Sequence, residues 1–282
     1  MARILVLGAS GMAGHIARLH LAECGHDVLG LARTPAPGLA SLDLEDSIAL
    51  GKFIDQARPE VVLNCAGVLI QDSERDPVRA IRIDALLPQL LSLAARSRGF
   101  RLIHVSTDCV FSGSGGPYHE DSPRDGSDVY GMAKALGEVA RGPDLTFRTS
   151  IVGPELKAEG RNLFAWFMRQ KGPIRGYSRC LWGGVTTLEL AKAVHFVVEN
   201  PLSGVAHLTR GVPISKYDLL RLFAELWGRQ DLVIEKDDTM VSDRSLISRR
   251  SDFIYPVPPF RDMLEELRQF MQRHGDLYRH YD

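Results

Sequence analysis

A glycine-rich turn near the start of the chain constrains its fold more than any other feature. The apolar segment Arg3–Leu7 is typical of a buried strand, and Gly8, Gly11 and Gly14 follow it at a GxxGxxG spacing before a helical stretch. Glycines here let the backbone approach a diphosphate, whose charge the helix amino-terminus stabilises. The turn therefore predicts a dinucleotide site, and close packing of helix on sheet without a ligand is the alternative. The predicted cofactor contacts are Gly8, Ser10, Gly11 and Met12.

Strand-like and helix-like segments alternate through roughly the first half of the chain. Such alternation predicts an α/β fold with a doubly wound parallel sheet of the Rossmann type. Ligands of such sheets bind at the carboxyl ends of the strands. The predicted strands are Arg3–Leu7, Asp27–Leu31, Val61–Asn64, Arg101–Val105 and Leu145–Thr149. The predicted helices of this half run from the glycine turn to about Cys24 and over Ser47–Gln56, Pro77–Ser97 and Tyr130–Ala140.

The pattern changes after about Ser150. Helices are predicted over 162–170, 187–199, 216–227 and 261–273, separated by less regular stretches. Such shorter, mixed elements are typical of a substrate domain packed on a cofactor domain. We therefore expect a cofactor domain over residues 1–150 and a smaller mixed α/β substrate domain over 151–282 at the carboxyl edge of the sheet, with some exchange of chain between them.

The residues after the second predicted strand bear on the choice of cofactor. A NAD site usually has an acidic residue about 20 residues past the glycines. This chain has Arg33 there instead, which suits the 2′-phosphate of NADPH, although a solvated arginine is the alternative and NADH stays open. Asp43, followed by Leu44, is a candidate contact of the adenine, or else a helix cap.

Tyr130 and Lys134 form a YxxxK pair in a segment that is predicted to be helical. Residues four apart share one face of a helix. Reduction of a ketone leaves an alkoxide that needs a proton, and an ammonium nearby moves a phenol from its usual pKa of about 10 towards working pH. Thr107 follows the fourth strand, where its hydroxyl can orient the carbonyl. A chance YxxxK on a polar helix is the alternative. The third strand ends beside the expected cofactor, at Cys65, Ala66 and Gly67.

Charge and cysteine content exclude several classes of protein. Lys and Arg total 34 against 35 Asp and Glu, so the net charge of −1 argues against a general nucleic-acid binder. No apolar run approaches the roughly 20 residues of a membrane span. The four cysteines form no CxxC pair and the nine histidines show no metal spacing, which favours reduced thiols and no metal. We expect a cytoplasmic monomer or homodimer that acts on a small molecule.

Several of these segments together resemble the extended short-chain dehydrogenases. The closest pattern is that of the dTDP-4-dehydrorhamnose reductases, and the likeness runs from Met1 to about Trp227. It implies NADPH-dependent reduction of the 4-keto group of a nucleotide-activated 6-deoxyhexose, for cell-surface polysaccharides. The segments that carry it are Gly8–Gly14, Asn64–Gly67, Ser106–Gly113, Tyr130–Lys134 and Phe147–Ser150.

The resemblance also implies roles for individual residues. Thr107, Tyr130 and Lys134 take the catalytic roles, and Tyr130 and Lys134 also contact the cofactor. Apart from the resemblance, Trp182 lies in a glycine-bounded loop and either stacks on a sugar or base or fills the domain interface. The residues expected at the nucleotide sugar are Val68, Thr107, Asp108, Asn162 and Trp182.

The chain departs from the family pattern at four places. Cys109 replaces the usual tyrosine, Asp84 replaces an asparagine, Ile151 replaces a tryptophan, and the tail over 231–282 diverges. These departures leave the sugar and nucleotide open. A NAD-dependent epimerase or dehydratase is one rival, and Arg33 speaks against it. A non-catalytic regulatory subunit, like that of methionine adenosyltransferase, is the other.

Overall fold

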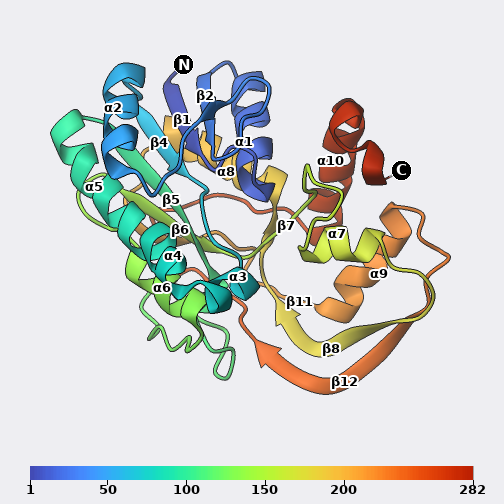
Figure 1. Ribbon diagram of the computed structural model, residues 1–282. Helices are drawn as coiled ribbons and strands as arrows, with labels where there is room; N and C mark the ends of the chain where they lie inside the picture. Colours follow the sequence, from blue (N-terminus) through green and yellow to red (C-terminus); the bar gives the residue numbers. More distant parts are fainter. Residues whose placement is uncertain (282) are drawn as a thin grey trace.

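A parallel seven-stranded sheet forms the centre of the computed structural model, which describes residues 1–281 (Figure 1). Each neighbouring pair of strands is parallel, so the carboxyl ends all meet at one edge. The predicted doubly wound α/β fold is confirmed. In spatial order the strands are β10 (Gly204–His207), β6 (Leu145–Thr149), β5 (Arg101–Thr107), β4 (Val61–Asn64), β1 (Arg3–Leu7), β2 (Asp27–Ala32) and β3 (Ala40–Ser41).

Helices cover both faces of the sheet. Successive residues of a strand point to opposite sides, and apolar side chains on both sides need to be buried. In β1, Ile4 and Val6 join one apolar cluster, whereas Leu5 and Leu7 join another. Strands buried on both faces read as continuous apolar runs, as this one does. One cluster includes residues of α1 (Met12–Glu23) and α8 (Thr187–Glu199), and the other includes residues of α2 (Ser47–Ala57) and α5 (Leu87–Arg98).

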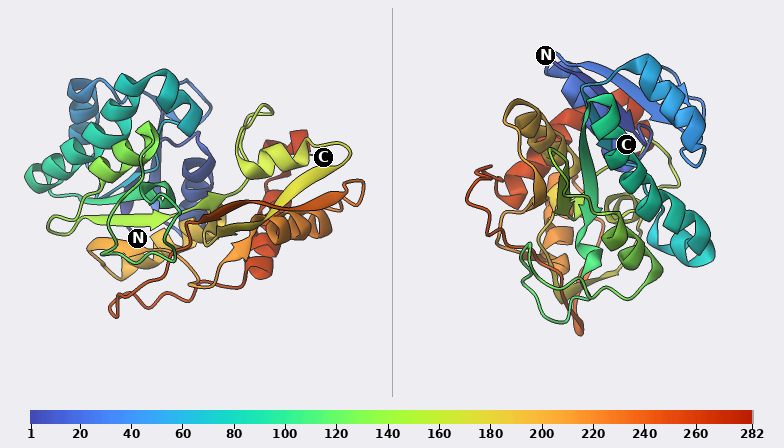
Figure 2. Two further views of the ribbon diagram at one scale, coloured as in Figure 1. Left: turned by 90° about the horizontal axis from the view of Figure 1, so that it is seen from below. Right: turned by 90° about the vertical axis from the view of Figure 1, so that its left-hand side faces the viewer.

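The second half of the chain contributes to the main sheet as well as to a separate layer. β10 pairs with β6, and α8 packs against α1. Beyond the sheet, β8 (Ile174–Trp182) lies between β11 (Ile214–Ser215) and β12 (Ile234–Asp243) (Figure 2). The remaining elements of this half are β7 (Ile151–Val152), β9 (Val185–Thr186), α7 (Leu163–Met168), α9 (Lys216–Leu226) and α10 (Phe260–Arg273).

The strands β8 and β12 were missed in the sequence. β12 carries mostly charged and polar residues and is exposed along much of its length. A strand of this kind has no buried face, so it shows no alternation of apolar and polar residues. The helices of this half were predicted more closely, since Thr186 caps α8 and Ser215 caps α9 through side-chain hydrogen bonds.

The long helix predicted over 77–97 is divided into three pieces. α3 (Ile70–Arg75) precedes it, and then α4 (Pro77–Ala80), a π turn over Ile81–Leu86 and α5 follow one another. The nitrogen of Leu87 donates to the carbonyl of Arg82, five residues back, and Pro88 has no N–H to continue the regular ladder. The π turn contains Asp84, which is fully buried and whose carboxylate lies beside the backbone nitrogen of Val68, just after β4.

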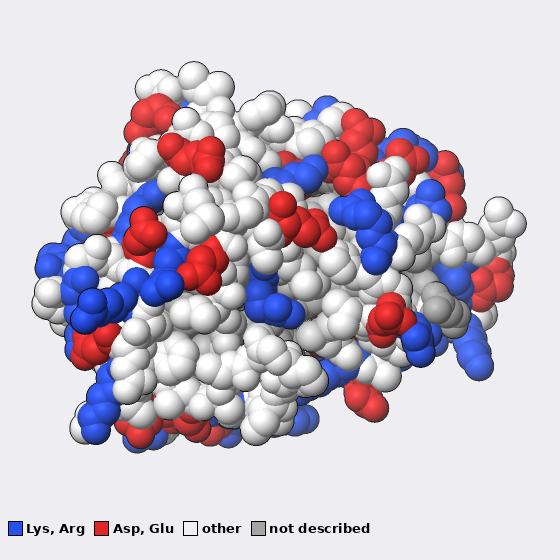
Figure 3. Space-filling model, turned by 90° about the horizontal axis from the view of Figure 1, so that it is seen from above, with Lys and Arg blue, Asp and Glu red and all other residues white. Residues whose placement is uncertain are grey.

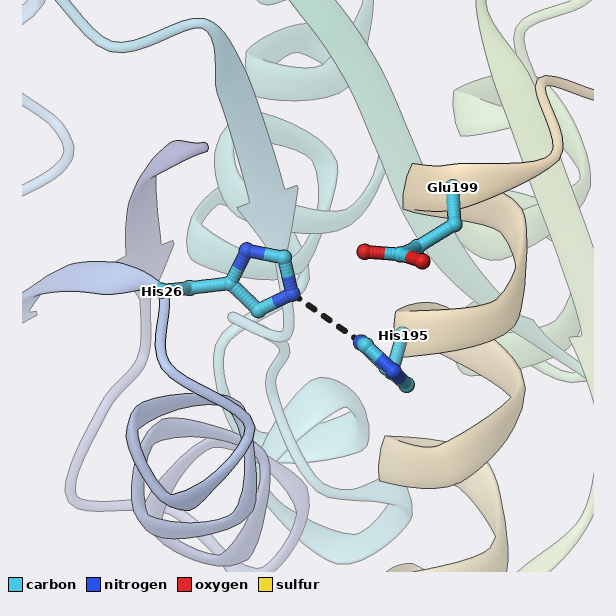
Figure 4. A group of neighbouring side chains, drawn as sticks. All are labelled: His26, His195 and Glu199. Carbon is cyan, nitrogen blue, oxygen red and sulfur yellow. Dashed lines mark hydrogen bonds between the residues drawn. The ribbon is translucent and has the colours of Figure 1, made fainter. Parts of the chain in front are cut away.

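A pair of histidines joins the start of β2 to α8 (Figure 4). The nitrogen of Ala2 donates to Nδ1 of His26 at 3.1 Å, which leaves the ring proton of a neutral His26 on Nε2. That nitrogen lies 3.0 Å from Nδ1 of His195 and donates to it. Glu199 is close enough to complete a candidate metal triad among the described residues, but this tautomer already occupies Nε2 of His26 with a proton.

Charged side chains of both signs are interspersed on the face drawn in Figure 3. Among the ion pairs of the protein, Nε of Arg98 lies 2.7 Å from the carboxylate of Asp55. Within the described chain, no helix has the length and apolar character needed to cross a membrane.

Candidate active site

A cavity of about 750 Å³ opens at the carboxyl edge of the main sheet. The ends of β2, β4, β5 and β6, the first turn of α1 and the α6 helix (Val129–Gly137) contribute to its wall, together with a loop over 155–162. The cavity brings together most of the predicted site residues. Those that line it are Gly11, Met12, Arg33, Cys65, Ala66, Gly67, Val68, Thr107, Asp108, Tyr130, Lys134 and Asn162.

The glycine turn is built for close backbone approach. Gly8 has a φ of +73°, and a Cβ there would lie 2.9 Å from the nitrogen of Ala66. A Cβ on Gly14 would lie 2.2 Å from the carbonyl oxygen of Gly8. Side chains at either position would therefore push the turn away from β4 or from α1. Gly8 and Ser10 lie in the turn but outside the lining of the cavity.

The first turn of α1 offers free backbone donors to the cavity. Gly11 is its N-cap and provides no side-chain acceptor, whereas Asp46, Asp128, Thr186 and Ser215 cap α2, α6, α8 and α9. The amino end of a helix carries unsatisfied N–H groups and a partial positive charge. An uncapped helix end of this type, facing a cavity through Met12 and Ala13, fits the diphosphate of a dinucleotide.

Of the residues predicted around the adenosine, one lines the cavity and two lie outside it. Arg33 follows β2 and lines the cavity. Asp43 is exposed beyond the short edge strand β3, and its carboxylate accepts from the nitrogen of Glu45 at 3.1 Å. Leu44 packs against the apolar cluster on the α2 face. Asp43 thus has a local backbone partner, but the N-cap of α2 is Asp46 and not Asp43. Arg33 lines the cavity, and its contact with a 2′-phosphate stays a prediction.

Tyr130 and Lys134 project from α6 beside the end of β5. Asp128 caps this helix by accepting from the nitrogen of Gly131 at 2.6 Å. Nζ of Lys134 donates to the carbonyl of Val105 at 2.7 Å. The hydroxyl of Thr107 accepts from the nitrogen of Cys109 at 3.1 Å and donates to Asp108 at 3.2 Å. The three predicted catalytic side chains therefore meet on one wall of the cavity.

The pKa of Tyr130 does not move in the direction that the sequence suggested. Burial raises it well above its ordinary value, and a hydrogen bond with Thr107 lowers it only in part. Burial also lowers the pKa of Lys134 from its ordinary value, while Asp84 raises it. Desolvation, together with the charges of Cys109 and Asp84, outweighs the hydrogen bond with Thr107, so the phenol keeps its proton, the form that a proton donor requires.

Asp84 faces Lys134 directly. An oxygen of its carboxylate lies 3.9 Å from Nζ of Lys134, and the carboxylate accepts from the nitrogen of Val68 at 3.1 Å. Burial raises the pKa of Asp84 to about 6, and Lys134 opposes that shift. A buried carboxylate thus stands where the resemblance predicted an asparagine, and it balances the charge of the buried lysine.

Trp182 lies outside this cavity. Its side chain is 7% exposed, and its ring packs 5.6 Å from that of Phe260 in the larger apolar cluster. The ring therefore packs inside the larger apolar cluster and does not face the cavity that collects the other predicted sugar contacts. Asn162 does line the cavity, and its side chain also caps α7 and donates to Glu155 at 2.7 Å.

Several cavity residues were not singled out in the sequence. They include the basic side chains of Arg75, Arg79 and Lys157, whose only signal in the sequence is their charge. Arg161 forms a two-point ion pair with Asp72 of α3, which connects the two walls of the cavity. Arg175 and Arg179 lie on β8, outside the lining of the cavity. The basic residues of the lining are Arg33, Arg75, Arg79, Lys134, Lys157 and Arg161.

A Rossmann fold with a tyrosine–lysine pair beside a strand-end threonine defines the extended short-chain dehydrogenase/reductase class. The model of the RmlD substrate binding domain family matches residues 2–238. The chain belongs to this family.

Named relatives agree with this assignment. A dTDP-4-keto-6-deoxy-D-glucose reductase of Streptomyces niveus is 30% identical over 80% of this chain and 79% of its own. A dTDP-4-dehydrorhamnose reductase of Streptomyces griseus is 39% identical, but the match spans 49% of this chain and only 44% of the relative. Among solved structures, a dTDP-4-dehydrorhamnose reductase of Bacillus anthracis in complex with NADP covers 96% of this chain and 99% of its own, with a TM-score of 0.82 at 17% identity.

Proposed function

We propose that the protein is an NADPH-dependent reductase of the 4-keto group of a nucleotide-activated 6-deoxyhexose. The observation that carries this proposal is the meeting of Thr107, Tyr130 and Lys134 on the wall of a cavity that also reaches the uncapped end of α1. Membership of the family and the names of its reductase relatives support the same reaction. We also propose a cytoplasmic location, which the four unpaired cysteines of the described chain support.

The two halves of the chain have different parts in binding the cofactor and the sugar. We propose that residues 1–150 hold NADPH, with the α1 end at the diphosphate and Arg33 at the 2′-phosphate, and that residues 151–282 complete the sugar site. Basic side chains of the loop over 155–162 suit a nucleotide diphosphate. The residues that we place at the sugar ring are Val68, Thr107, Asp108 and Asn162.

When bound, NADPH would supply the hydride that the carbonyl carbon of the sugar accepts. Thr107 binds the carbonyl oxygen and orients it towards Tyr130. Tyr130 donates its phenolic proton to the oxygen as negative charge develops there. Lys134 holds the cofactor ribose and stabilises the phenolate that remains, while Asp84 balances the lysine charge.

The test is NADPH oxidation by the purified protein with dTDP-4-keto-6-deoxy sugars. Tyr130→Phe keeps the ring but removes the proton donor, so turnover should fall by roughly 10²–10⁴-fold, while NADPH affinity measured by fluorescence stays close to that of the wild type. Lys134→Met should damage both turnover and NADPH affinity. NADPH binding without oxidation of any such sugar, or normal turnover in Tyr130→Phe, would favour a regulatory subunit instead.

A further inference from the structure

The segment after α10 folds back against the candidate active site. It consists of two short 3-10 turns over Gly275–Leu277 and Arg279–Tyr281, at the red end of the chain in Figure 1. It belongs to the tail that diverges most from the family pattern, and the proposed reaction gives it no role. Two tyrosines of this segment make contacts near the cavity: Tyr278 with His15, four residues after the lining residue Gly11, and Tyr281 with the lining residue Glu155.

The first contact leads to the glycine turn. Tyr278 is 3% exposed, and its hydroxyl lies 2.9 Å from Nε2 of His15 on α1. Nδ1 of the same ring lies 2.8 Å from the carbonyl oxygen of Gly11. A carbonyl oxygen only accepts, so Nδ1 carries the proton and Nε2 accepts from Tyr278. Burial lowers the pKa of His15 to about 4, which keeps the ring neutral.

These hydrogen bonds connect Tyr278, through His15, to Gly11 at the amino end of α1. Gly11 is the N-cap of α1, directly before the free N–H groups that we assign to the diphosphate. Its carbonyl accepts from both the ring and the backbone nitrogen of His15. The orientation of the Gly11 peptide, and with it the direction of those donors, therefore depends on a side chain that Tyr278 holds.

The second contact leads to the substrate loop. The hydroxyl of Tyr281 accepts from the nitrogen of Glu155 at 2.9 Å, and Nε2 of His280 lies 3.0 Å from the carbonyl of Glu155. The side chain of Glu155 in turn accepts from the backbone nitrogens of Arg161 and Asn162, at 2.8 and 2.9 Å. Tyr281 thus anchors the loop that carries the proposed sugar and diphosphate contacts.

We propose that Tyr278 and Tyr281 are positioning residues for the two substrates: Tyr278 fixes the cofactor turn through His15, and Tyr281 fixes the loop over 155–162 through Glu155. The two tyrosines lie three residues apart on one segment, so they hold the two walls at a set spacing. This inference rests on the proposed function of the cavity.

Three tyrosine-to-phenylalanine variants of the full chain test it. Tyr278→Phe should raise the dissociation constant of NADPH by about 3- to 10-fold, the effect of one lost hydrogen bond, with little change in the KM of the sugar. Tyr281→Phe should raise the KM of the sugar by a similar factor and leave NADPH binding unchanged. Tyr255→Phe is the matched control, because its hydroxyl donates to Glu189 at 2.6 Å outside the cavity.

A double variant separates positioning from general loss of stability. His15→Asn keeps a donor near the carbonyl of Gly11 but loses the link to the tail, so adding Tyr278→Phe should weaken NADPH binding no further. Equal effects of Tyr278→Phe and Tyr255→Phe on NADPH binding would overturn the inference. A wild-type protein that fails to bind NADPH would refute the proposed function instead.

Discussion

Asp84 gives this active site a titratable group beside its lysine. Its carboxylate is fully buried and lies 3.9 Å from Nζ of Lys134. An asparagine at the same place would offer an amide without charge. The stability of the charged form of Lys134 therefore depends on pH, because protonation of Asp84 removes the negative partner of a buried ammonium.

The pH profile should report this group. Burial raises the pKa of Asp84 to about 6, so the carboxylate is charged above that pH and becomes neutral as the pH falls through it. We expect kcat/KM of the wild type to fall below about pH 6 and Asp84→Asn to keep its activity there, measured from pH 5 to 8. An acid limb of the same shape in both proteins would assign it to another group.

At the scale of elements, α6 and the π turn approach each other closely at a glycine. A Cβ on Gly137 would lie 1.9 Å from the carbonyl oxygen of Asp84. Pro88, four residues after Asp84, has no N–H for that carbonyl, so its oxygen is left on the side that α6 packs against. This contact sets the distance between the helix that carries Lys134 and the turn that carries Asp84.

Gly137→Ala should force the two elements apart. We expect a loss of about 1–3 kcal/mol in the free energy of unfolding, and a fall in turnover because Tyr130 and Lys134 shift with α6. Denaturant unfolding and NADPH oxidation measure the two effects. Gly51→Ala in α2 is the control, since its Cβ would meet only the end of the Arg98 side chain, at 3.3 Å, and should leave both quantities unchanged or raise stability.

At the scale of the whole molecule, a buried polar network joins the two halves of the chain. The guanidinium of Arg148 donates to Glu138 at 2.7 and 2.8 Å, and Ser106 donates to the same carboxylate at 2.9 Å. Nη1 of Arg148 also lies 2.9 Å from Nε2 of His207, on β10. The network therefore links β5, which ends at Thr107, to β10, the strand that the second half contributes.

This network should make the fold sensitive to acid. Burial and then Arg148 lower the pKa of His207 from its ordinary 6.5 to about 4, against the opposing pull of Glu120, Ile247 and Glu138. The unfolded chain therefore binds this proton more readily, and stability present above pH 6.5 is lost as the pH falls towards 4. The free energy of unfolding that His207 accounts for over this pH range is about 3 kcal/mol at most. His207→Gln should flatten the slope of unfolding free energy against pH; an unchanged slope would exclude this histidine as the cause.

The sequence by itself determined the sheet, its central strands and the cofactor turn. These features have local signals: continuous apolar runs for buried parallel strands, glycines for the close approach at Gly8 and Gly14, and polar caps such as Thr186 before helices. The YxxxK pair is likewise local, because residues four apart on a helix always share a face.

Only the tertiary structure decided the features that depend on contacts between distant segments. The pairing of β12 with β8, the burial of Trp182 and the return of Tyr278 to His15 join residues far apart in the chain, and none leaves a periodic pattern. The direction in which the pKa of Tyr130 shifts was also decided by the packing, because desolvation depends on everything that surrounds the phenol. The sequence shows only the lysine four residues away.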